Sequence, residues 1–539
     1  MDIEFHRPTR QFRVKIVGEP PEYEAVKKLG RWDPLRKVFW VAEIFWADMM
    51  ALSQPGDLDI FSPYLIQEES NSNSCSIHTA PHALDYQRKG VEFLTGPERG
   101  MGLFDSLGLG KSAQALWAFD TLARRGDLQV MVVVCPKRVI PEWHDQFQKH
   151  LMREPEPGEF LVMNYEQTYR KGADAIQKAT EGRRWVLVID EVHRGAGDDT
   201  RIYEALTGLS ERATRVWTLT GTPVRNRPES SLGVYRLTTG AQIKRPDFLR
   251  KFCLQNSWGQ VVGYRHLEQL EAIFKTFAIR RRKEDVLELP PKQVIPVPVV
   301  LEGRQSLLYA QMRDEFLVEL REHGGGVDIL RAPWVFSQMI RLLQIACHPG
   351  LLGEDIPNDR VAKMVALGEI LDEAGEQKVI VWSKHPWVLE QVVAFFPHLN
   401  GVYAHGRCSE KQNDEARRKF REDPSCMLAA LSIGAFNAGV NLQQESGVAV
   451  FFDLPWEYAP WVQAQDRIHR IGQTRDRVTL YVLVAEETLD GVVLRTLEKK
   501  RLLEEQVIGG ATVAAPSAGG DVRDGLTRDD LLCALRARR

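Results

Sequence analysis

Cysteine is scarce in this chain, and its cysteines are scattered. The 539 residues include 7 cysteines, and none of them forms a Cys-x-x-Cys pair. This spacing argues against a structural zinc site and against a disulfide framework. We therefore expect the cysteines to be buried as small apolar side chains. They are Cys75, Cys135, Cys253, Cys347, Cys408, Cys426 and Cys533.

Long apolar runs and an N-terminal targeting segment are missing as well. No apolar run approaches the roughly 18 residues that a membrane span needs. The opening MDIEFHRPTRQFRVKIV lacks the apolar stretch of a signal peptide. We expect a cytoplasmic protein with no membrane partner. Its compact size suggests a bacterial or viral origin, and a eukaryotic source would make it nuclear.

An excess of charge of either sign is also absent. Lys and Arg number 70 and Asp and Glu number 73, which gives a net charge of −3. Any contact with nucleic acid must therefore come from a local basic surface. Hydrophobic residues make up 44% of the chain and charged residues 27%. This composition is typical of a globular protein and excludes a disordered chain.

What the chain does have is short apolar runs that alternate with helical patterns. One series contains MGLFD, VMVVVCP and WVLVID, and a second contains KVIVWS, MLAALS, VAVFFD and VTLYVLV. Fully apolar, Val-rich strands between helices indicate parallel sheets covered on both faces. The predicted fold class is α/β, with two parallel-sheet lobes, helical insertions and a small N-terminal α+β module.

Changes in composition suggest the domain boundaries. The polar stretches QPGDLDIFSP and EESNSNSCS are typical of a linker, and IGGATVAAPSAGGD near the C-terminus is another. No repeat with a period of about 20 to 50 residues is evident. We expect an N-terminal module at 1–53, a linker at 54–79, a first lobe at 80–298, a helical insertion at 299–375, a second lobe at 376–505, and a linker with a C-terminal helix at 506–539.

The stretch FDSLGLGKSAQAL, residues 104–116, has most of what a phosphate-binding loop requires. Gly108 and Gly110 let the backbone close around phosphates, and Lys111 and Ser112 stand where a helix begins. Asp105 occupies the position where such a loop usually has glycine. The loop alone leaves open a strand-to-helix turn without a ligand.

The stretch WVLVIDEVHRG places Asp190 and Glu191 at the carboxyl end of a predicted strand. One carboxylate can hold magnesium while the other orients the attacking water. A plain surface turn is the alternative. His193 is expected to link this segment to the LTGTP stretch at 219–223, unless it is a satisfied core histidine.

Two arginines in QAQDRIHRIGQ, residues 463–473, complete the pattern. Arg467 and Arg470 are expected three residues apart on one helical face, where they suit a γ-phosphate. A solvated basic helix face is the alternative for these two residues alone. The four motifs in this order make a nucleotide hydrolase the better interpretation.

The ordered motifs resemble the Swi/Snf-type DNA translocases of helicase superfamily two, over about residues 80–500. In that family the nucleotide loop opens with Asp, so Asp105 fits the resemblance. Ser106 replaces an acidic residue and Ser112 a threonine. FAIRRRKEDVLELPPK and LLQIACHPGLL are further hallmarks of the family. The RRRK run at 280–283 either binds phosphate or braces the fold, or it is a solvated helix end.

Other segments are closer to the annealing-helicase branch. LSIGAFNAGVNL has Phe436-Asn437 where many members have paired glycines, and DLPWEYAPWVQAQDRIHRIGQTRDRV resembles the same branch, with Trp456 where the family places a tryptophan against DNA. Glu457-Tyr458 departs from the Asn-Pro that commonly follows this tryptophan, so the resemblance does not define the shape of this loop. RWDPLRKVFWV is similar to the HARP module of that branch, with an unrelated accessory fold as the alternative.

The resemblance implies RecA-like lobes, with ATP and Mg²⁺ as cofactors and Gln87 as the adenine reader. The residues implied for ATP are Gln87, Asp105, Ser106, Leu107, Gly108, Leu109, Gly110, Lys111, Ser112 and Gly439. Those implied for Mg²⁺ are Ser112 and Asp190, and those implied for catalysis are Lys111, Asp190, Glu191, Arg467 and Arg470. Those implied for DNA are Lys137, Asn164, Tyr165, Ser383, Lys384, Ser432, Asn441 and Trp456, the last with a core tryptophan as the alternative.

The function implied is an ATP-dependent translocase on double-stranded DNA that remodels DNA structures or protein–DNA complexes. Its expected partners are duplex or branched DNA, gripped through the backbone with little sequence preference, and proteins bound by the N-terminal module. A strand-separating DNA or RNA helicase and a DNA-binding scaffold without hydrolysis are the alternatives.

Overall fold

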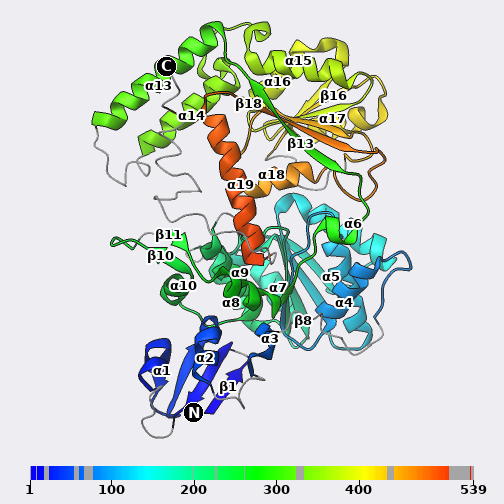
Figure 1. Cartoon of the computed structure of the whole chain (residues 1–539). Helices are drawn as coiled ribbons and strands as arrows, with labels where there is room; N and C mark the ends of the chain where they lie inside the picture. The colour runs from blue at the N-terminus through cyan, green and yellow to red at the C-terminus, as the bar shows by residue number, and fades with distance from the viewer. Residues whose placement is uncertain are drawn as a thin grey trace. The chain divides into compact units, whose positions relative to one another are not determined.

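The structure is a computed structural model. It describes residues 2–7, 9–16, 23–53, 60–65, 77–170, 172–197, 200–224, 227–259, 261–322, 333–433, 442–508 and 535. The chain divides into two compact units (Figure 1). Unit 1 comprises Met1–Gln255, Gly263–Val286 and Leu502–Pro516, and unit 2 comprises Asn256–Val262, Leu287–Arg501 and Ser517–Arg539.

Unit 1 begins with a small antiparallel sheet. Its strands β1 (Asp2–His6), β2 (Gln11–Lys15), β3 (Gly30–Asp33) and β4 (Val38–Ala42) are ordered β1-β2-β4-β3. Alternation along β2 buries Phe12 and Val14 on one face, as expected for a sheet with one solvated side. Helices α1 (Tyr23–Leu29), α2 (Trp46–Leu52) and α3 (Ser62–Leu65) accompany the sheet. The predicted α+β module is confirmed.

The main sheet of unit 1 is parallel and has the order β12-β5-β9-β8-β6-β7. Its strands are β5 (Gly100–Leu103), β6 (Val130–Cys135), β7 (Phe160–Asn164), β8 (Trp185–Asp190), β9 (Arg215–Leu219) and β12 (Ala278–Ile279). Successive side chains of β6 enter different cores, Val132 and Val134 on one face and Met131 and Val133 on the other. Both faces are therefore covered, which explains the uninterrupted apolar strand.

Helices cover both faces of this sheet. Residues of α4 (Asp85–Thr95), α5 (Lys111–Arg124) and α6 (Ile140–Leu151) share one core. Residues of α7 (Gly172–Thr180), α8 (Arg201–Arg212) and α9 (Ser231–Thr239) share the other. The remaining elements of this region are α10 (Arg245–Phe252), β10 (Cys253–Gln255), β11 (Val261–Tyr264), α11 (Leu267–Lys275) and α12 (Lys283–Val286).

The N-terminal sheet and the first lobe share one hydrophobic core. Phe12 and Phe45 belong to the same buried cluster as Tyr235 and Phe277. The carboxylate of Glu43, which is fully buried in the short helix η1 (Glu43–Phe45), lies within this contact. It accepts hydrogen bonds from Arg10, from Tyr235 and from the hydroxyl of Tyr64 at 2.7 Å. The N-terminal sheet therefore packs directly against the first lobe.

Unit 2 contains a second parallel sheet, ordered β13-β18-β17-β14-β16-β15. Its strands are β13 (Lys292–Val299), β14 (Val379–Ser383), β15 (Val402–Ala404), β16 (Leu428–Ser432), β17 (Val448–Phe451) and β18 (Val478–Ala485). Its helices are α13 (Gly303–Glu322), α14 (Pro333–Cys347), α15 (Ala362–Ala374), α16 (Pro386–Phe395), α17 (Glu410–Glu422), α18 (Tyr458–Gln465) and α19 (Leu489–Ile508), whose last residues from Leu502 belong to unit 1. The predicted class of two α/β lobes is confirmed.

Strand β13 belongs to the sheet of the second lobe, and not to the first lobe as expected. The first lobe was expected to extend to residue 298, but β13 pairs with β18, so that Val297 lies opposite Leu483. Pro296 and Pro298 are tolerated because β13 is an edge strand, where a missing N–H need not break a ladder. In the expected helical insertion, α13 and α14 contribute Phe316 and Met339 to the core of the second lobe.

The cysteines and the helices agree with two expectations from composition, that cysteines are buried and that apolar runs are short. Of the cysteines in the described segments, four are buried and Cys408 is half-buried, and all five are free thiols. Among the helices in the described part of the chain, none is both long enough and apolar enough to cross a membrane.

Candidate nucleotide-binding site

The loop between β5 and α5 has the shape that its glycines predict. Gly108 and Gly110 have φ values of 84° and 75°, and α5 begins directly afterwards at Lys111. A Cβ atom on Gly110 would lie only 2.7 Å from the side-chain nitrogen of Gln87. The left-handed backbone therefore favours glycine there, and a larger residue would also displace the end of the Gln87 side chain. The loop places backbone N–H groups at the N-terminus of a helix of 14 residues, a site that favours anions.

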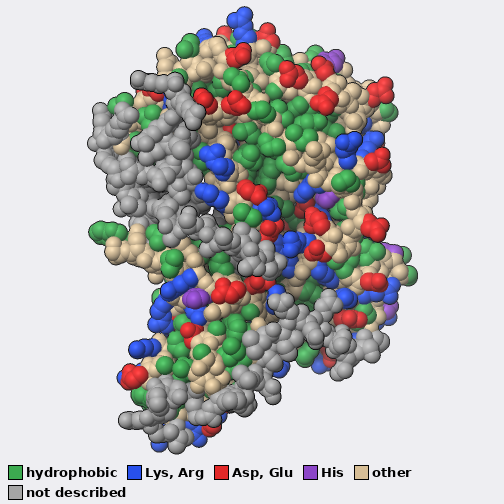
Figure 2. Space-filling model, in the orientation of Figure 1, with side chains coloured by type: hydrophobic (Ala, Val, Ile, Leu, Met, Phe, Trp, Pro, Cys, Tyr) green, Lys and Arg blue, Asp and Glu red, His purple; other side chains and the backbone are tan. Residues whose placement is uncertain are grey.

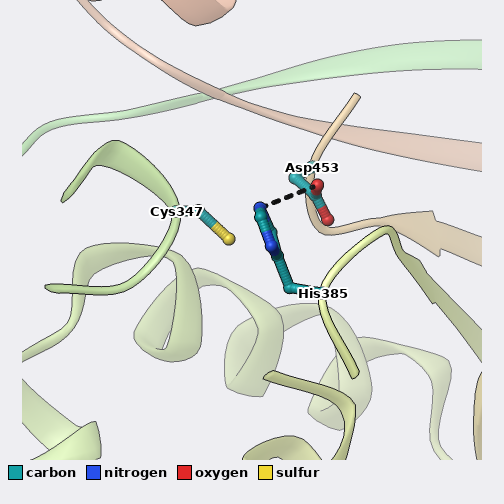
Figure 3. Close-up of side chains that lie close together, drawn as sticks. All are labelled: Cys347, His385 and Asp453. Atoms are coloured by element: carbon teal, nitrogen blue, oxygen red, sulfur yellow. Dashed lines mark ion pairs between the residues drawn. The ribbon is translucent and has the colours of Figure 1, made fainter. Parts of the chain in front are cut away.

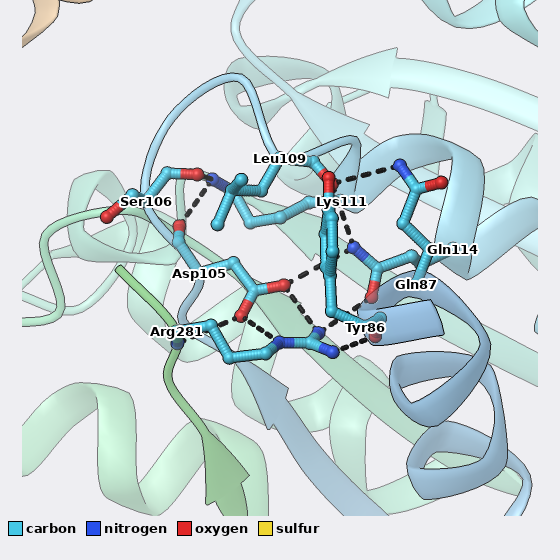
Figure 4. Close-up of polar contacts among 8 residues, drawn as sticks. All are labelled: Tyr86, Gln87, Asp105, Ser106, Leu109, Lys111, Gln114 and Arg281. Carbon is cyan, nitrogen blue, oxygen red and sulfur yellow. Dashed lines mark hydrogen bonds and ion pairs between the residues drawn. The ribbon is translucent and has the colours of Figure 1, made fainter. Parts of the chain in front are cut away.

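Asp105 is fully buried beneath this loop and pairs with Arg281. Its carboxylate accepts hydrogen bonds from Arg281 Nε at 2.9 Å, Nη2 at 2.6 Å and the backbone N–H at 3.1 Å (Figure 4). Gln114 bridges the two, since its amide nitrogen lies 3.3 Å from Asp105 and its oxygen accepts from Arg281 at 2.8 Å. The Asp105 side chain is therefore occupied within the fold.

This contact explains part of the RRRK run. Arg281 ties the segment after β12 to the base of the loop, which favours the bracing interpretation for that residue. Arg280 lies 3.3 Å from Glu504 within unit 1, and Arg282 lies 3.7 Å from Asp285. Burial raises the pKa of Glu504 to about 7, although Arg280 acts in the opposite direction.

The Lys111 side chain is folded into the loop and is only 9% exposed. Its ammonium group donates to the backbone carbonyls of Asp105 at 2.7 Å and Ser106 at 3.2 Å (Figure 4). Ser112 follows in the first turn of α5 and is partly exposed. A cation inside a ring of backbone amides, next to a hydroxyl, is the arrangement that holds phosphate and a divalent cation.

Gln87 also contacts the loop. Its side-chain nitrogen donates to the carbonyl of Leu109 at 3.3 Å, and its oxygen accepts from the Leu84 backbone at 3.0 Å. The Tyr86 hydroxyl donates to the same Leu109 carbonyl at 3.2 Å. The start of α4 therefore supports the glycine-rich loop from the side.

The acidic pair lies at the same edge of the sheet as the loop. Strand β9 separates β5 from β8, and all three are parallel, so their carboxyl ends lie together. Asp190 accepts a hydrogen bond from Trp143 Nε1 at 3.0 Å. Burial, followed by repulsion from Glu191, raises the pKa of Asp190 to about 7. Two adjacent carboxylates in such a place favour a bound cation.

Glu191 has an unusual backbone and a polar side-chain environment. Its φ of 57° is in the left-handed region, which is uncommon for a non-glycine residue. The Tyr165 hydroxyl donates to the carbonyls of Asp190 at 2.6 Å and Glu191 at 2.9 Å. The carboxylate of Glu191 accepts from Thr220 at 3.3 Å and lies 3.4 Å from His193 Nδ1.

His193 links the acidic pair to the LTGTP segment. Its Nδ1 lies 3.0 Å from the hydroxyl oxygen of Thr220, which also accepts from the Thr222 backbone at 3.1 Å. A Cβ atom on Gly221 would lie 3.1 Å from the Leu107 side chain, so this segment packs against the phosphate loop. The hydrogen bonds connect the ends of β8 and β9 through the predicted histidine.

The residues predicted to contact DNA from unit 1 differ in exposure. Lys137 is exposed in η3 (Lys137–Val139), and Asn164 caps η4 (Tyr165–Tyr169) by accepting from Gln167 at 2.9 Å. Tyr165 is buried, and its hydroxyl is occupied by the acidic segment. Its side chain therefore supports the site from within, contrary to the expected surface contact. Lys and Arg are interspersed with Asp and Glu on the face in Figure 2.

The residues of unit 2 that were predicted to contact DNA also differ in exposure. Ser383 and Ser432 are buried, and the oxygen of Ser383 accepts from the backbone of His385 at 3.1 Å. Lys384 is half-buried and donates to the Leu454 carbonyl at 3.2 Å. Trp456 is half-buried and packs against the core of the second lobe. Gly439 and Asn441 lie outside the described residues.

Arg467 and Arg470 are half-buried, but they do not share a helical face as expected. Helix α18 ends at Gln465, and both arginines follow it in a turn. After Gln465 the backbone N–H groups of Arg467 and Ile468 bond three residues back, to Ala464 and Gln465, and the Arg467 carbonyl accepts from the Leu442 N–H at 3.3 Å. The backbone at Arg467 is therefore hydrogen-bonded to a neighbouring segment.

Sequence reasoning did not identify three residues of this site. Trp143 comes from α6, Thr220 from the end of β9, and Arg281 from a segment 176 positions beyond Asp105. Thr220 lies in the LTGTP motif, and Arg281 lies in the RRRK run, so both carried a local signal. Trp143 carried none, because its role arises only from a hydrogen bond to Asp190, 47 positions later in the chain.

Comparisons with known proteins agree with this geometry. The family model for the SNF2-related domain matches residues 86–184 and 159–351. The model for the helicase conserved C-terminal domain matches residues 362–472.

Individual relatives are more distant. The chain is 27% identical over 440 residues to the SWI/SNF-related matrix-associated actin-dependent regulator of chromatin subfamily A-like protein 1 of Xenopus tropicalis, a match covering 77% of this chain and 44% of that protein. It is 26% identical over 450 residues to an uncharacterized ATP-dependent helicase of Mycoplasma genitalium, covering 78% and 42% respectively. The chain thus spans less than half the length of these relatives.

A solved structure of the Sulfolobus solfataricus SWI2/SNF2 ATPase core in complex with dsDNA has 24% sequence identity and a TM-score of 0.36, and the match covers 80% of this chain and 94% of that one. The two family models together match most of the chain, in the order of the motifs described above. We conclude that this chain belongs to the Swi/Snf, or SNF2-related, family.

Proposed function

We propose that this protein hydrolyses ATP with Mg²⁺ and uses the energy to move along double-stranded DNA. The observation that carries the proposal is the meeting of the glycine-rich loop, the acidic pair and the LTGTP segment at one edge of a parallel sheet. Membership of the SNF2-related family supports the same activity.

Lys111 and the loop amides would bind the phosphates of ATP. To do so, the Lys111 ammonium exchanges its two backbone carbonyl partners for phosphate oxygens, which are stronger acceptors because they are charged. The Ser112 hydroxyl and Asp190 would hold Mg²⁺, which neutralises charge on the phosphates. Gln87, already beside the loop, would read the adenine.

Glu191 would orient and deprotonate the attacking water. Its carboxylate is held by Thr220 and lies next to His193, so its position is fixed before the substrate arrives. Arg467 and Arg470 would act on the γ-phosphate as arginine fingers from the second unit. The backbone hydrogen bond at Arg467 supports this role, because less loop ordering then remains to be done.

The DNA partner would be gripped through its phosphate backbone. Lys137 is exposed, and Lys384, Asn164 and Trp456 are partly exposed, which supports them as contacts. Backbone contacts carry little sequence information, so we propose a motor that remodels DNA structures or protein–DNA complexes. The chromatin regulator and the ATP-dependent helicase among the relatives support this class.

The first test compares Lys111→Ala with Glu191→Gln. Lys111→Ala should lose nucleotide binding, whereas Glu191→Gln should bind ATP and stall its hydrolysis. Binding is measured with a fluorescent ATP analogue, and turnover by phosphate release with and without duplex DNA. Turnover of Glu191→Gln near that of the wild type would contradict the assignment of Glu191.

The second test separates translocation from strand separation. The wild-type protein should displace the third strand of a triplex in the presence of ATP and leave a plain tailed duplex intact. Efficient unwinding of the tailed duplex without triplex displacement would favour a helicase. DNA binding without any ATP turnover would favour a scaffold.

A further inference from the structure

Three side chains with metal-binding atoms meet in unit 2. Cys347 is the last residue of α14, His385 follows β14, and Asp453 follows β17 (Figure 3). One ligand atom from each of the three lies within 4.8 Å of the others. Strands β14 and β17 are parallel neighbours, so their carboxyl ends bring His385 and Asp453 to the same edge of the sheet.

The centre of this cluster is buried, and two of its polar atoms lack a hydrogen-bond partner, although Asp453 Oδ1 accepts from the Lys384 backbone at 3.2 Å and Oδ2 lies 3.5 Å from the Lys384 ammonium. Cys347 is 1% exposed and Asp453 is 3% exposed. His385 Nε2 and Asp453 Oδ2 are buried without a hydrogen-bond partner, and they lie 3.8 Å apart, too far for a hydrogen bond. Leaving a buried polar group without a partner destabilises the fold. A cation between the two atoms would satisfy both.

We propose that Cys347, His385 and Asp453 bind one Zn²⁺ ion. A thiolate, an imidazole and a carboxylate are all established zinc ligands, whereas Mg²⁺ and Ca²⁺ take oxygen ligands. Three protein ligands leave one tetrahedral position for a ligand that is not a side chain of the cluster, such as water. The site goes beyond the proposed function, which uses no sulfur ligand.

Two lysines near the cluster do not prevent cation binding. The Lys363 ammonium donates to the Phe452 carbonyl at 3.0 Å and pairs with Asp490 at 2.5 Å. The Lys384 ammonium donates to the Leu454 carbonyl at 3.2 Å and lies 3.5 Å from Asp453 Oδ2. When Zn²⁺ binds and the Cys347 thiol gives up its proton, the cluster gains one positive charge, and both lysines keep partners outside the cluster, Asp490 for Lys363 and the Leu454 carbonyl for Lys384.

The cysteine spacing does not predict this site. Zinc sites are recognised in sequences by close ligand pairs, and Cys347 has no cysteine near it. The three ligands come from segments 38 and 68 positions apart, as counted from their residue numbers. A bound ion would link the turn at Ser383–His385 to the end of α14 through its bonds to His385 and Cys347.

Metal binding is tested on the full-length protein after treatment with a chelator. The protein should take up one equivalent of Zn²⁺ at this site, and Co²⁺ in its place should give the absorption band of a cobalt–thiolate bond. Cys347→Ser should abolish that band and weaken binding by more than about 100-fold, the upper range for losing an outer-shell partner. Cys426→Ser, which removes another buried cysteine, should leave both unchanged.

Two further measurements keep the result decisive if Cys347→Ser folds poorly. His385→Asn retains the thiol and should shift the cobalt band and weaken binding, and added Zn²⁺ should raise the unfolding temperature of the wild type. A wild-type protein that shows no cobalt–thiolate band would overturn the proposal. So would equal metal affinities of Cys347→Ser and Cys426→Ser. Either result would identify a metal-free cluster in which His385 and Lys384 share Asp453.

Discussion

A buried carboxylate destabilises the folded state unless a cation is paired with it, and in this protein Arg281 is the cation paired with Asp105. Asp105 is fully buried, and Arg281 contacts it with two side-chain nitrogens and the backbone N–H. Removing one partner of such a pair leaves an uncompensated charge in the interior. The first residue of the phosphate loop is therefore fixed by a residue far away in the sequence.

Arg281→Ala should destabilise unit 1 by about 3–5 kcal/mol, because Asp105 would be left buried and unpaired. The matched control is Arg282→Ala, whose partially exposed pair with Asp285 should contribute only about 0–1 kcal/mol. Both are measured by denaturant unfolding. Adding Asp105→Asn to Arg281→Ala should recover part of the loss, and a double variant less stable than Arg281→Ala alone would contradict this account.

His150 gives a pH dependence whose sign can be worked out. Burial, followed by the charge of Lys149, lowers the pKa of His150 from 6.5 to about 4. Its ring packs edge-on against Trp117, with centroids 5.2 Å apart. As the pH falls from about 6.5 to about 4, His150 becomes protonated in the unfolded chain but stays neutral in the folded chain. The free energy of unfolding therefore decreases across that pH range.

His150→Gln should therefore lose less stability than the wild type between pH 6.5 and pH 4. The difference should be on the order of 1–2 kcal/mol, after allowing for solvent screening of a half-buried ring. The measurement is unfolding free energy against pH, with His398→Gln, at an exposed position, as control. Parallel curves for the wild type and His150→Gln would show that His150 is not responsible.

At the scale of elements, the sequence predicts what is local. Fully apolar runs such as the one in β6 indicate a strand covered on both faces, and the loop from Asp105 to Ser112 was recognised from its residue types. Pairings between distant segments were not predictable. The partner of β13 is β18, about 186 residues later by their first positions, and no local pattern encodes that choice.

Burial of single polar residues escaped prediction for a related reason. Tyr165 and Ser383 lie at strand ends where a surface position is plausible, yet packing of neighbouring segments covers both. Helix α18 likewise ends at Gln465, before Arg467, and a helical pattern in the sequence does not reveal this boundary. Such positions are decided by tertiary contacts and not by spacing.

The element that joins the N-terminal sheet to the first lobe is η1, through Glu43. Glu43→Ala should lower the stability of unit 1 by about 3–5 kcal/mol, because Arg10 would be left as a buried, unpaired charge. Glu24→Ala, at an exposed pair with Lys27, should change stability by about 0–1 kcal/mol. Unfolding in denaturant compares the two. Equal values would mean that the buried network does not hold the sheet in place.

At the scale of the whole molecule, the proposed catalysis requires residues from both units. Arg467→Ala or Arg470→Ala should leave ATP affinity within about tenfold of the wild type, yet reduce turnover by roughly 10³ or more. This pattern is expected because an arginine finger acts on charge that develops only in the transition state. Arg477→Ala, at an exposed position after the same turn, is the control.

Nucleotide affinity and phosphate release are measured on the same preparations. Equal losses of affinity and turnover would show that the arginines bind the ground state or stabilise unit 2. Turnover of Arg477→Ala as low as that of Arg467→Ala would point to a general disturbance of this loop.

The shared core of the N-terminal sheet and the first lobe has a consequence for synthesis on the ribosome. Phe12, Phe45 and Glu43 emerge early, but Tyr235 and Phe277, which share their core, are made about 200 residues later. At about 5–20 residues per second, the delay is on the order of 10–50 s. During that time the apolar face of the nascent sheet lacks its permanent cover, which makes it a natural binding surface for a chaperone at the ribosomal exit.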